Sequence, residues 1–500
     1  MKRALLLVIA VVACLGGLYA LQGRAAPKPV PRAAEPRPQP SAAEPAAEPP
    51  RASAPDEVPG QVRYIAVGGG ATPEYTEVSL EQDLELAAQT LRGPGLLMFA
   101  GGSDSASVRL QRKPGKASLL ARLGELFDPR GARDSEYRRT RLIAQTANLE
   151  NFETNFSLVA SSGREPLLVW VASHGVQGDH ARDNHIELWG GEPMTVAHLD
   201  ELAASATRPL RFVIASCYSG GFAELAFAHA EAADGPARSP RCGLFAGTWD
   251  RQTSGCDPNP DRRSQEGYSM HVLHALRGED REGKQLPLHE LDLDGDGKIS
   301  LLEAHTRARI ASHSIDVPTT TSERYLREVE HREAALNPKL LPEEHAVIAR
   351  LGARLGLATK AAAEQRYKEI SARLDGLEDD LDAADDELEH AQNRLSAELL
   401  ARWPILSDPY HDEFASTVAK NESAISKALT ESRLAQAYQS ARDQVDEISA
   451  RASALDPDEA EVLRLLRAYE TLGLASALAA RGGATYAYYQ TLLACERSVP

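Results

Sequence analysis

From Val62 to about Ile310, short apolar runs rich in β-branched residues alternate with longer amphipathic stretches. The short runs predict buried strands, and the stretches between them predict helices. This alternation is typical of a parallel sheet whose strands are joined by helical crossovers. The sequence therefore predicts an α/β domain over residues 61–325, with an open, mostly parallel sheet flanked by helices.

Residues 326–500 have a helical pattern almost throughout. Apolar side chains spaced alternately three and four residues apart predict a coiled-coil seam. The seam consists of Tyr367, Ile370, Leu374, Leu377, Leu381, Ala384, Leu388, Ala391 and Leu395. Trp403 and Pro404 interrupt it, and a second apolar run from Val418 to Ile448 is expected to fold back as an antiparallel hairpin. This all-α coiled-coil-like domain is either ordinary helical core or a stalk or partner-binding module, and it carries no chemistry of its own.

The first helix of the α/β domain is expected to begin at Ser79, because Ser79 and Gln82 fit a capping box. In such a box the hydroxyl and the side chain three residues later satisfy the free N–H groups of the first turn.

Residues 1–24 fit a signal or membrane anchor. Lys2 and Arg3 precede the uncharged residues 4–21, a run just long enough to span a bilayer as a helix. Positive charge before the span directs the rest of the chain out of the cytoplasm, toward the periplasm or the cell exterior. The sequence around Cys14 loosely resembles a lipoprotein cleavage box, but the apolar run continues past it, which favours an uncleaved membrane tether.

Residues 25–60 are rich in Pro, Ala and Glu and are expected to form a linker. The whole chain has a net charge of -17 and a pI near 5.4. No basic stripe offsets this acidic balance, so the composition argues against nucleic acid as a partner.

Two of the predicted strands end in residues with nucleophilic or basic side chains. The run LLVWVAS is followed by His174 and Gly175, and the run RFVIAS is followed by Cys217. Ligands bind at the carboxyl edge of an open parallel sheet, so these ends can place an imidazole beside a thiol. Taken singly, a buried core cysteine and a satisfied strand-end histidine are the simpler interpretations. Together the two motifs favour a thiol nucleophile assisted by histidine.

These motifs resemble the caspase, metacaspase and legumain superfamily of cysteine peptidases, in which a His-Gly strand end precedes a Cys strand end. Residues 64–70 and 96–102 look like the first two strands of bacterial caspase-like proteins. The resemblance implies a cysteine endopeptidase acting on a protein or peptide substrate. His174 and Cys217 would form the dyad, and the N–H groups of Gly175 and Cys217 the oxyanion hole. The alternatives are a catalytically inactive caspase-like scaffold for calcium-dependent binding or assembly, and a purely structural surface protein.

A second motif lies at residues 292–303, which fit the twelve-residue EF-hand loop. Repulsion between its carboxylates predicts a bound cation, Ca²⁺, and an acidic surface turn is the alternative. The expected ligands are Asp292, Asp294, Asp296, the carbonyl of Lys298, Ser300 and Glu303. Pro287 interrupts the helix that would normally precede such a loop.

Three further cysteines follow Cys217 in the chain and lie outside both motifs. Cys242 and Cys256 flank a short strand-like segment and are candidates for a disulfide in an oxidising compartment. Cys495 is left over.

Overall fold

The computed structural model describes residues 59–112, 118–127 and 135–500. The expected anchor (residues 1–24), the possible lipid site at Cys14 and nearly all of the expected linker lie outside the described residues. Among the residues described, no helix is long and apolar enough to cross a membrane.

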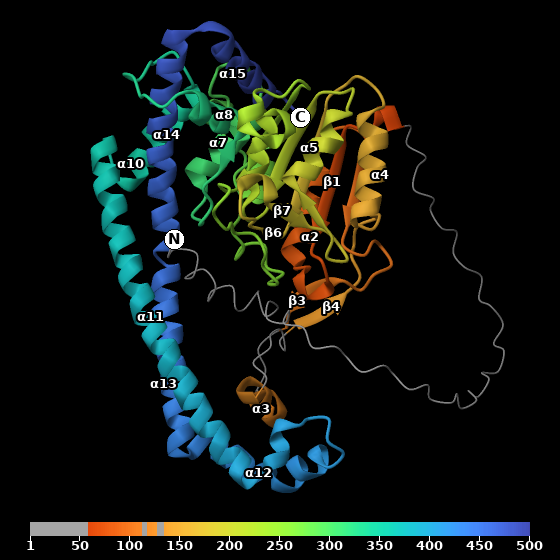
Figure 1. The fold of residues 1–500 in the computed structure, drawn as a ribbon, viewed down its shortest axis with the longest axis vertical. Coiled ribbons are helices and arrows are strands. Elements are labelled where there is room, and N and C mark those ends of the chain that lie inside the picture. The colour runs from red at the N-terminus through yellow and green to blue at the C-terminus, as the bar shows by residue number, and fades with distance from the viewer. Residues whose placement is uncertain (1–58, 113–117, 128–134) are drawn as a thin grey trace, which may run out of the picture.

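A six-stranded sheet forms the centre of the α/β domain (Figure 1). Its strand order is β11-β10-β9-β5-β1-β2, and every pair is parallel except β10 with β11. The strands are β1 (Tyr64–Gly69), β2 (Gly95–Phe99), β5 (Leu167–Ser173), β9 (Leu210–Ala215), β10 (Arg241–Phe245) and β11 (Thr319–Thr320). β1, β5 and β10 are buried along their whole length. Burial on both faces explains why these strands read as continuous apolar runs in the sequence.

Helices cover both faces of this sheet. Alternate residues of β1 belong to opposite cores: Tyr64 packs in the cluster that contains α2, α6 and α7, whereas Ile65 packs in the cluster that contains α4 and α5. The helices of the domain are α2 (Val78–Thr90), α3 (Leu119–Phe127), α4 (Leu149–Ala160), α5 (Val196–Ala204), α6 (Tyr268–Leu276) and α7 (Leu301–Ala311). The predicted fold class is confirmed: a mostly parallel α/β domain flanked by helices, followed by an all-helical region.

The expected capping box at Ser79 is wrong. Helix α2 begins at Val78, and its N-cap residue is Glu77, which makes no capping bond with its side chain. The hydroxyl of Ser79 instead accepts a hydrogen bond from the N–H of Asp257, at 2.8 Å. The hydroxyl that the local pattern assigns to the helix end thus makes a long-range contact instead. The carboxylate of Glu77 makes no capping bond and is available for another role.

The domain also contains two small sheets. β3 (Val108–Gln111) pairs with β4 (Ser135–Arg138), and β6 (Gly175–Val176), β7 (His185–Glu187) and β8 (Pro193–Thr195) form a second one. Helix α3 lies between β3 and β4 in the chain. Its Leu123 and Leu126 pack at the far end of the helical region, beside α11 (Lys360–Arg402) and α12 (Phe414–Glu431) (Figure 1).

The C-terminal region is helical, with the coiled-coil seam on its longest helix. The predicted seam residues from Ile370 to Leu381 are buried, and α11 packs against α13 after the chain reverses near Pro404, as the hairpin prediction expects. Ser432 divides the second run into two helices. The helices are α8 (Thr321–Val329), α9 (Pro342–Ala346), α10 (Gly352–Leu355), α11 (Lys360–Arg402), α12 (Phe414–Glu431), α13 (Arg433–Ser453), α14 (Asp456–Arg481) and α15 (Gly483–Glu496).

The last two helices return to the α/β domain (Figure 1). Leu472 and Leu478 of α14 and Leu492 of α15 belong to the same core cluster as Trp170 of β5. A disulfide between Cys242 in β10 and Cys495 in α15, with Cα atoms 6.0 Å apart, joins the two regions covalently. The expected Cys242–Cys256 pair is therefore wrong, because β10 presents Cys242 to α15.

Candidate functional site

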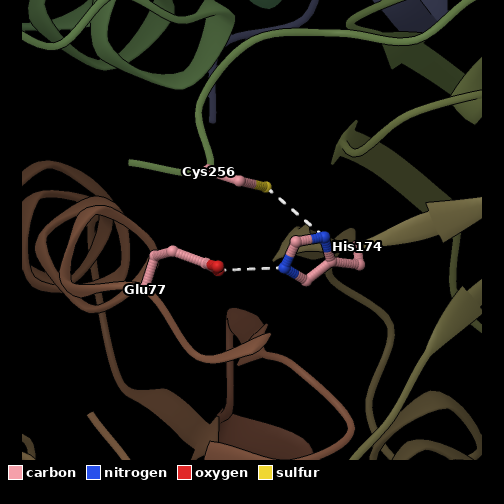
Figure 2. A group of neighbouring side chains, drawn as sticks. All are labelled: Glu77, His174 and Cys256. Carbon is pink, nitrogen blue, oxygen red and sulfur yellow. Dashed lines mark hydrogen bonds and ion pairs between the residues drawn. The ribbon is translucent and has the colours of Figure 1, made fainter. Parts of the chain in front are cut away.

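His174 follows the last residue of β5 and lies between two other polar side chains (Figure 2). Its Nε2 is 2.9 Å from Oε2 of Glu77, and its Nδ1 is 3.6 Å from Sγ of Cys256. The ring of Tyr75 meets the imidazole edge to face, with centroids 5.9 Å apart. Both ring nitrogens are therefore engaged, and the orientation of the ring is fixed.

Cys217 follows β9, the strand next to β5, so the structure brings the two predicted dyad residues to the same edge of the sheet. The closest partners of its Sγ belong to Thr253: the thiol accepts from the N–H at 3.4 Å and donates to the carbonyl oxygen at 3.6 Å. Burial raises the pKa of Cys217 to about 11, and Cys256 adds to the rise, whereas Thr253 and His174 act against it. Cys217 is therefore a protonated thiol at neutral pH in this arrangement.

Gly175 and Cys217 touch through their backbones. A Cβ atom added to Gly175 would lie 2.0 Å from the carbonyl oxygen of Cys217, which no side chain tolerates. Directly after the cysteine, Tyr218 has a left-handed backbone with φ 58°, a strained conformation for a bulky residue. Such strain persists where surrounding contacts impose it, and it clusters at functional sites. Here Asn184 imposes it by donating to the carbonyl of Tyr218, at 2.9 Å.

Glu77 is a site residue that the sequence pattern did not identify. Its side chain has no solvent exposure, and it forms an ion pair with Arg109 at 3.6 Å in addition to its contact with His174. Burial favours the neutral acid, but the charges of His174 and Arg109 outweigh it and lower the pKa of Glu77. The sequence offered one indication of Glu77: it is an acidic residue at the start of the helix that follows β1.

The electrostatics of His174 follow from these neighbours. Burial favours the neutral ring, but the thiol of Cys256 and the carboxylate of Glu77 together raise its pKa well above the usual value. The imidazole is therefore strongly basic and readily holds a proton between the two groups.

Cys256 reaches His174 from the long loop between β10 and α6, residues 246–267. Two contacts hold the loop here. The N–H of Ser254 donates to the buried carboxylate of Asp316 at 2.7 Å, and the N–H of Asp257 donates to Ser79. The loop also meets the helical region, because Arg251 pairs with Glu459 of α14 at 2.8 Å. Cys256 and Cys217 are the two cysteines among the described residues that are not in a disulfide.

We call Glu77, His174, Cys217 and Cys256 the strand-end site. A cavity of about 10 Å³, the space of roughly one water molecule, lies between Cys217 and Cys256. The two thiols therefore share one small space, and one of them, Cys256, also contacts the basic imidazole that Glu77 holds. This set can support thiol chemistry assisted by an oriented base, since a nucleophile, a base and a group that orients the base are all present.

The predicted calcium ligands form a separate feature, the acidic loop (residues 292–303). Carboxylate oxygens of Asp292, Asp294 and Asp296 lie within 4.8 Å of one another. Asp292 accepts from the N–H groups of Gly295 and Gly297, at 2.7 and 3.0 Å, which curves the loop. In the described stretch before the loop, α6 ends at Leu276, and a 3₁₀ turn, Leu288–Glu290, is the element that comes directly before it, as Pro287 led us to expect.

The second half of the acidic loop forms the start of α7. Ser300 is the N-cap, and Glu303 completes a capping box with it, accepting from the N–H of Ser300 at 2.8 Å and from that of Leu293 at 2.6 Å. Lys298 donates its N–H to Asp296 at 2.8 Å. The oxygen ligands that calcium prefers are thus collected in one loop, and its last carboxylate is directed back toward the first half of the loop.

No protein-family model and no curated protein matches this chain.

Proposed function

We propose that this chain is an exported cysteine endopeptidase of the caspase-like type, with Cys217 as nucleophile and His174 as base. One observation carries the proposal: His174 and Cys217 follow adjacent parallel strands, with the backbone of Gly175 pressed against that of Cys217. The carboxyl edge of a parallel sheet is where ligands bind in such folds. The substrate is a protein or a peptide.

In the proposed reaction, Nδ1 of His174 leaves Cys256, the thiol of Cys217 leaves Thr253, and the neutral imidazole takes the proton of that thiol. The thiolate attacks the peptide carbonyl, and the N–H groups of Gly175 and Cys217 stabilise the oxyanion. His174 then returns the proton to the leaving amine, and water hydrolyses the thioester with His174 as base. Glu77 holds the imidazole in place and stabilises the imidazolium that forms each time His174 takes a proton. The proposal requires His174 and Cys217 to approach each other when substrate binds, and catalytic hydrogen bonds often form or tighten only in such a complex.

A second function is favoured by one observation. Burial holds Cys217 as a thiol that bonds to Thr253, and His174 contacts Cys256 rather than Cys217. This arrangement is compatible with a caspase-like scaffold that acts in calcium-dependent binding or assembly and does not cleave its partner. Its partner would be a protein that contacts the C-terminal helices.

The test compares the two thiols of the site by mutation. Cys217→Ala and His174→Ala should each abolish cleavage of a peptide library, by at least 1000-fold, while the melting temperature stays within a few degrees. Cys256→Ala is the matched control, because it removes a thiol from the same cavity. Full activity in Cys217→Ala together with none in Cys256→Ala would mean that Cys256, rather than Cys217, is the nucleophile. Absence of cleavage by the wild-type chain and of rapid alkylation at either thiol would favour the scaffold.

The proposed location is outside the cytoplasm, with a membrane tether at the N-terminus. The Cys242–Cys495 disulfide supports an oxidising compartment, since structural disulfides persist mainly in exported proteins. A topology reporter fused after Gly60 should be active only outside the cytoplasm. We also propose Ca²⁺ as a ligand of the acidic loop, because the three aspartates and Glu303 supply the hard oxygen ligands that this cation requires.

A further inference from the structure

Three side chains of the strand-end site have the donor atoms of a transition-metal centre. One donor atom each from Glu77, His174 and Cys256 lies within 4.8 Å of the others. They come from three parts of the chain, and Glu77 and Cys256 point toward the ring of His174, one at each ring nitrogen (Figure 2). Glu77 is fully buried, and His174 is only 16% exposed.

The spacing fits a tetrahedral ion. A zinc ion binds imidazole nitrogen at about 2.0–2.1 Å and thiolate sulfur at about 2.3 Å, so the two donors are about 3.5 Å apart at the tetrahedral angle. Nδ1 of His174 and Sγ of Cys256 are 3.6 Å apart. A divalent ion can therefore enter between these two atoms with little movement of either side chain, and the carboxylate of Glu77 turns from Nε2 toward the ion to bind it.

The charges also match. A carboxylate and a thiolate carry two negative charges, and a neutral imidazole adds none, so a divalent cation makes the group neutral. Such compensation matters because uncompensated charge is costly where water is excluded. Oε1 of Glu77 is buried without a hydrogen bond and has only the ion pair with Arg109, so it is a further oxygen that a cation could satisfy.

A small cavity adjoins one of the three donors, Cys256. It is lined also by Cys217, and its volume suits a single water molecule, which could serve as a fourth ligand on that side of the ion. Three protein ligands with one open position are typical of zinc sites that exchange a ligand.

We propose that Glu77, His174 and Cys256 form a binding site for a thiophilic divalent cation of the Zn²⁺ type, and that the bound cation inhibits the peptidase reaction. The inhibition rests on the proposed function, whereas the binding does not. The metal takes the nitrogen lone pair that the base needs, and the proton shared by His174 and Cys256 is released to solvent. This site is distinct from the acidic loop, whose oxygen ligands favour calcium.

Binding is tested with Co²⁺, a spectroscopic substitute for zinc, on the full chain after treatment with a chelator. One equivalent should give tetrahedral visible bands and a thiolate-to-cobalt charge-transfer band, both displaced by Zn²⁺. Cys256→Ser should remove the charge-transfer band, and Glu77→Gln should weaken cobalt binding at least tenfold. Asp292→Asn, which alters the acidic loop, is the matched control and should leave the spectrum unchanged.

The wild-type chain gives a second measurement that does not depend on the folding of a variant. Zn²⁺ should protect Cys256 from alkylation, as followed by mass spectrometry of the modified peptides. The absence of a charge-transfer band, its persistence in Cys256→Ser, or unchanged alkylation of Cys256 would each overturn the metal site.

The proposed inhibition of peptide cleavage by the bound cation is tested separately. Zn²⁺ should suppress peptide cleavage at the concentrations at which it displaces Co²⁺, and a chelator should restore cleavage. Cleavage that continues with the site fully occupied would overturn the inhibition alone. A chain that binds cobalt as expected but cleaves no peptide would refute the peptidase proposal and leave the metal site standing.

Discussion

The strand-end site and the acidic loop are built in opposite ways. The strand-end site is largely buried, and its residues come from four segments that are far apart in the chain. The acidic loop consists of twelve consecutive residues, and Asp294 and Asp296 are exposed. Charges interact strongly where water is excluded and weakly where water and salt screen them. We therefore expect substitutions in the strand-end site to have large and specific effects and substitutions in the acidic loop to have small ones.

The largest effect expected beyond loss of the dyad is that of Glu77→Gln. Glutamine keeps the shape and a hydrogen-bond acceptor but removes the charge that favours protonated His174. Because acid–base assistance contributes about 10²- to 10⁴-fold, kcat should fall on the order of 100-fold with little change in KM. NMR titration of the His174 ring should show a lowered pKa. Glu81→Gln is the matched control, because Glu81 is also buried near the start of α2 but bonds to Arg138. An unchanged pKa of His174 would contradict the role given to Glu77.

The second prediction concerns the disulfide that joins the sheet of the strand-end site to the C-terminal helix. Cys242 and Cys495 are 253 residues apart, so the bond strongly restricts the unfolded chain. Cys242→Ser and Cys495→Ser should each lower the free energy of unfolding by about 2–5 kcal/mol. The double variant should cost little more than either single one, as measured by chemical denaturation. Additive losses would mean that the two cysteines act independently.

A third prediction tests another buried carboxylate. Glu496 accepts hydrogen bonds from the N–H of Ser322 and the hydroxyl of Thr321, both at 2.7 Å, but burial raises its pKa from 4.5 to about 7. Folding therefore favours the protonated acid. The stability it contributes is complete below pH 4.5 and is lost as the pH rises through 7.

The corresponding variant is Glu496→Gln, which resembles the protonated acid at every pH. Relative to wild type it should raise the melting temperature at pH 8 and have little effect at pH 4.5. The gain at pH 8 should be on the order of 3 kcal/mol at most, from 1.36 kcal/mol for each unit of pKa. Equal shifts at both values of pH would indicate a change in packing rather than the loss of a buried charge.

The contrast between the two sites also explains how far the sequence could be interpreted. His174 and Cys217 were identifiable because each directly follows an apolar run that predicts a strand. The acidic loop was identifiable because all its ligand positions are local. Cys256 was not, because its contact with His174 depends on how residues 246–267 fold over the sheet edge, held by Asp316 and Ser79. Glu77 was not, because its contact with His174 depends on where α2 begins against the sheet, and the local pattern assigned that helix end to Ser79.

The same reasoning applies to the fold. The alternation of strands and helices predicted the sheet, and the spacing of apolar residues predicted the long helix α11 and its reversal near Pro404. The partner of Cys242 could not be predicted, because it depends on the return of α15 to β10 after more than two hundred residues. Distance along the chain, rather than the chemistry of the residues, limited the prediction.

The smallest expected effect is that of calcium on stability. Asp292 already curves the acidic loop by accepting two backbone N–H groups, so calcium should bind with little ordering of the backbone. With a Kd on the order of 10⁻⁴ to 10⁻³ M, as in extracellular modules, tenfold excess calcium should add about 1.4 kcal/mol to the free energy of unfolding. Calorimetry should show this as a rise in melting temperature, whereas magnesium should substitute poorly because it requires a tighter octahedral geometry.

Glu303→Gln separates the calcium response from the structural role of the same residue. Glutamine keeps an oxygen that can accept from the N–H of Ser300 and so preserves the capping box of α7. It lacks the carboxylate that would bind the ion with two oxygens. The melting temperature without calcium should therefore change little, and the calcium-dependent rise should disappear. A rise that persists in Glu303→Gln, or none in the wild type, would reduce the acidic loop to a turn that caps a helix.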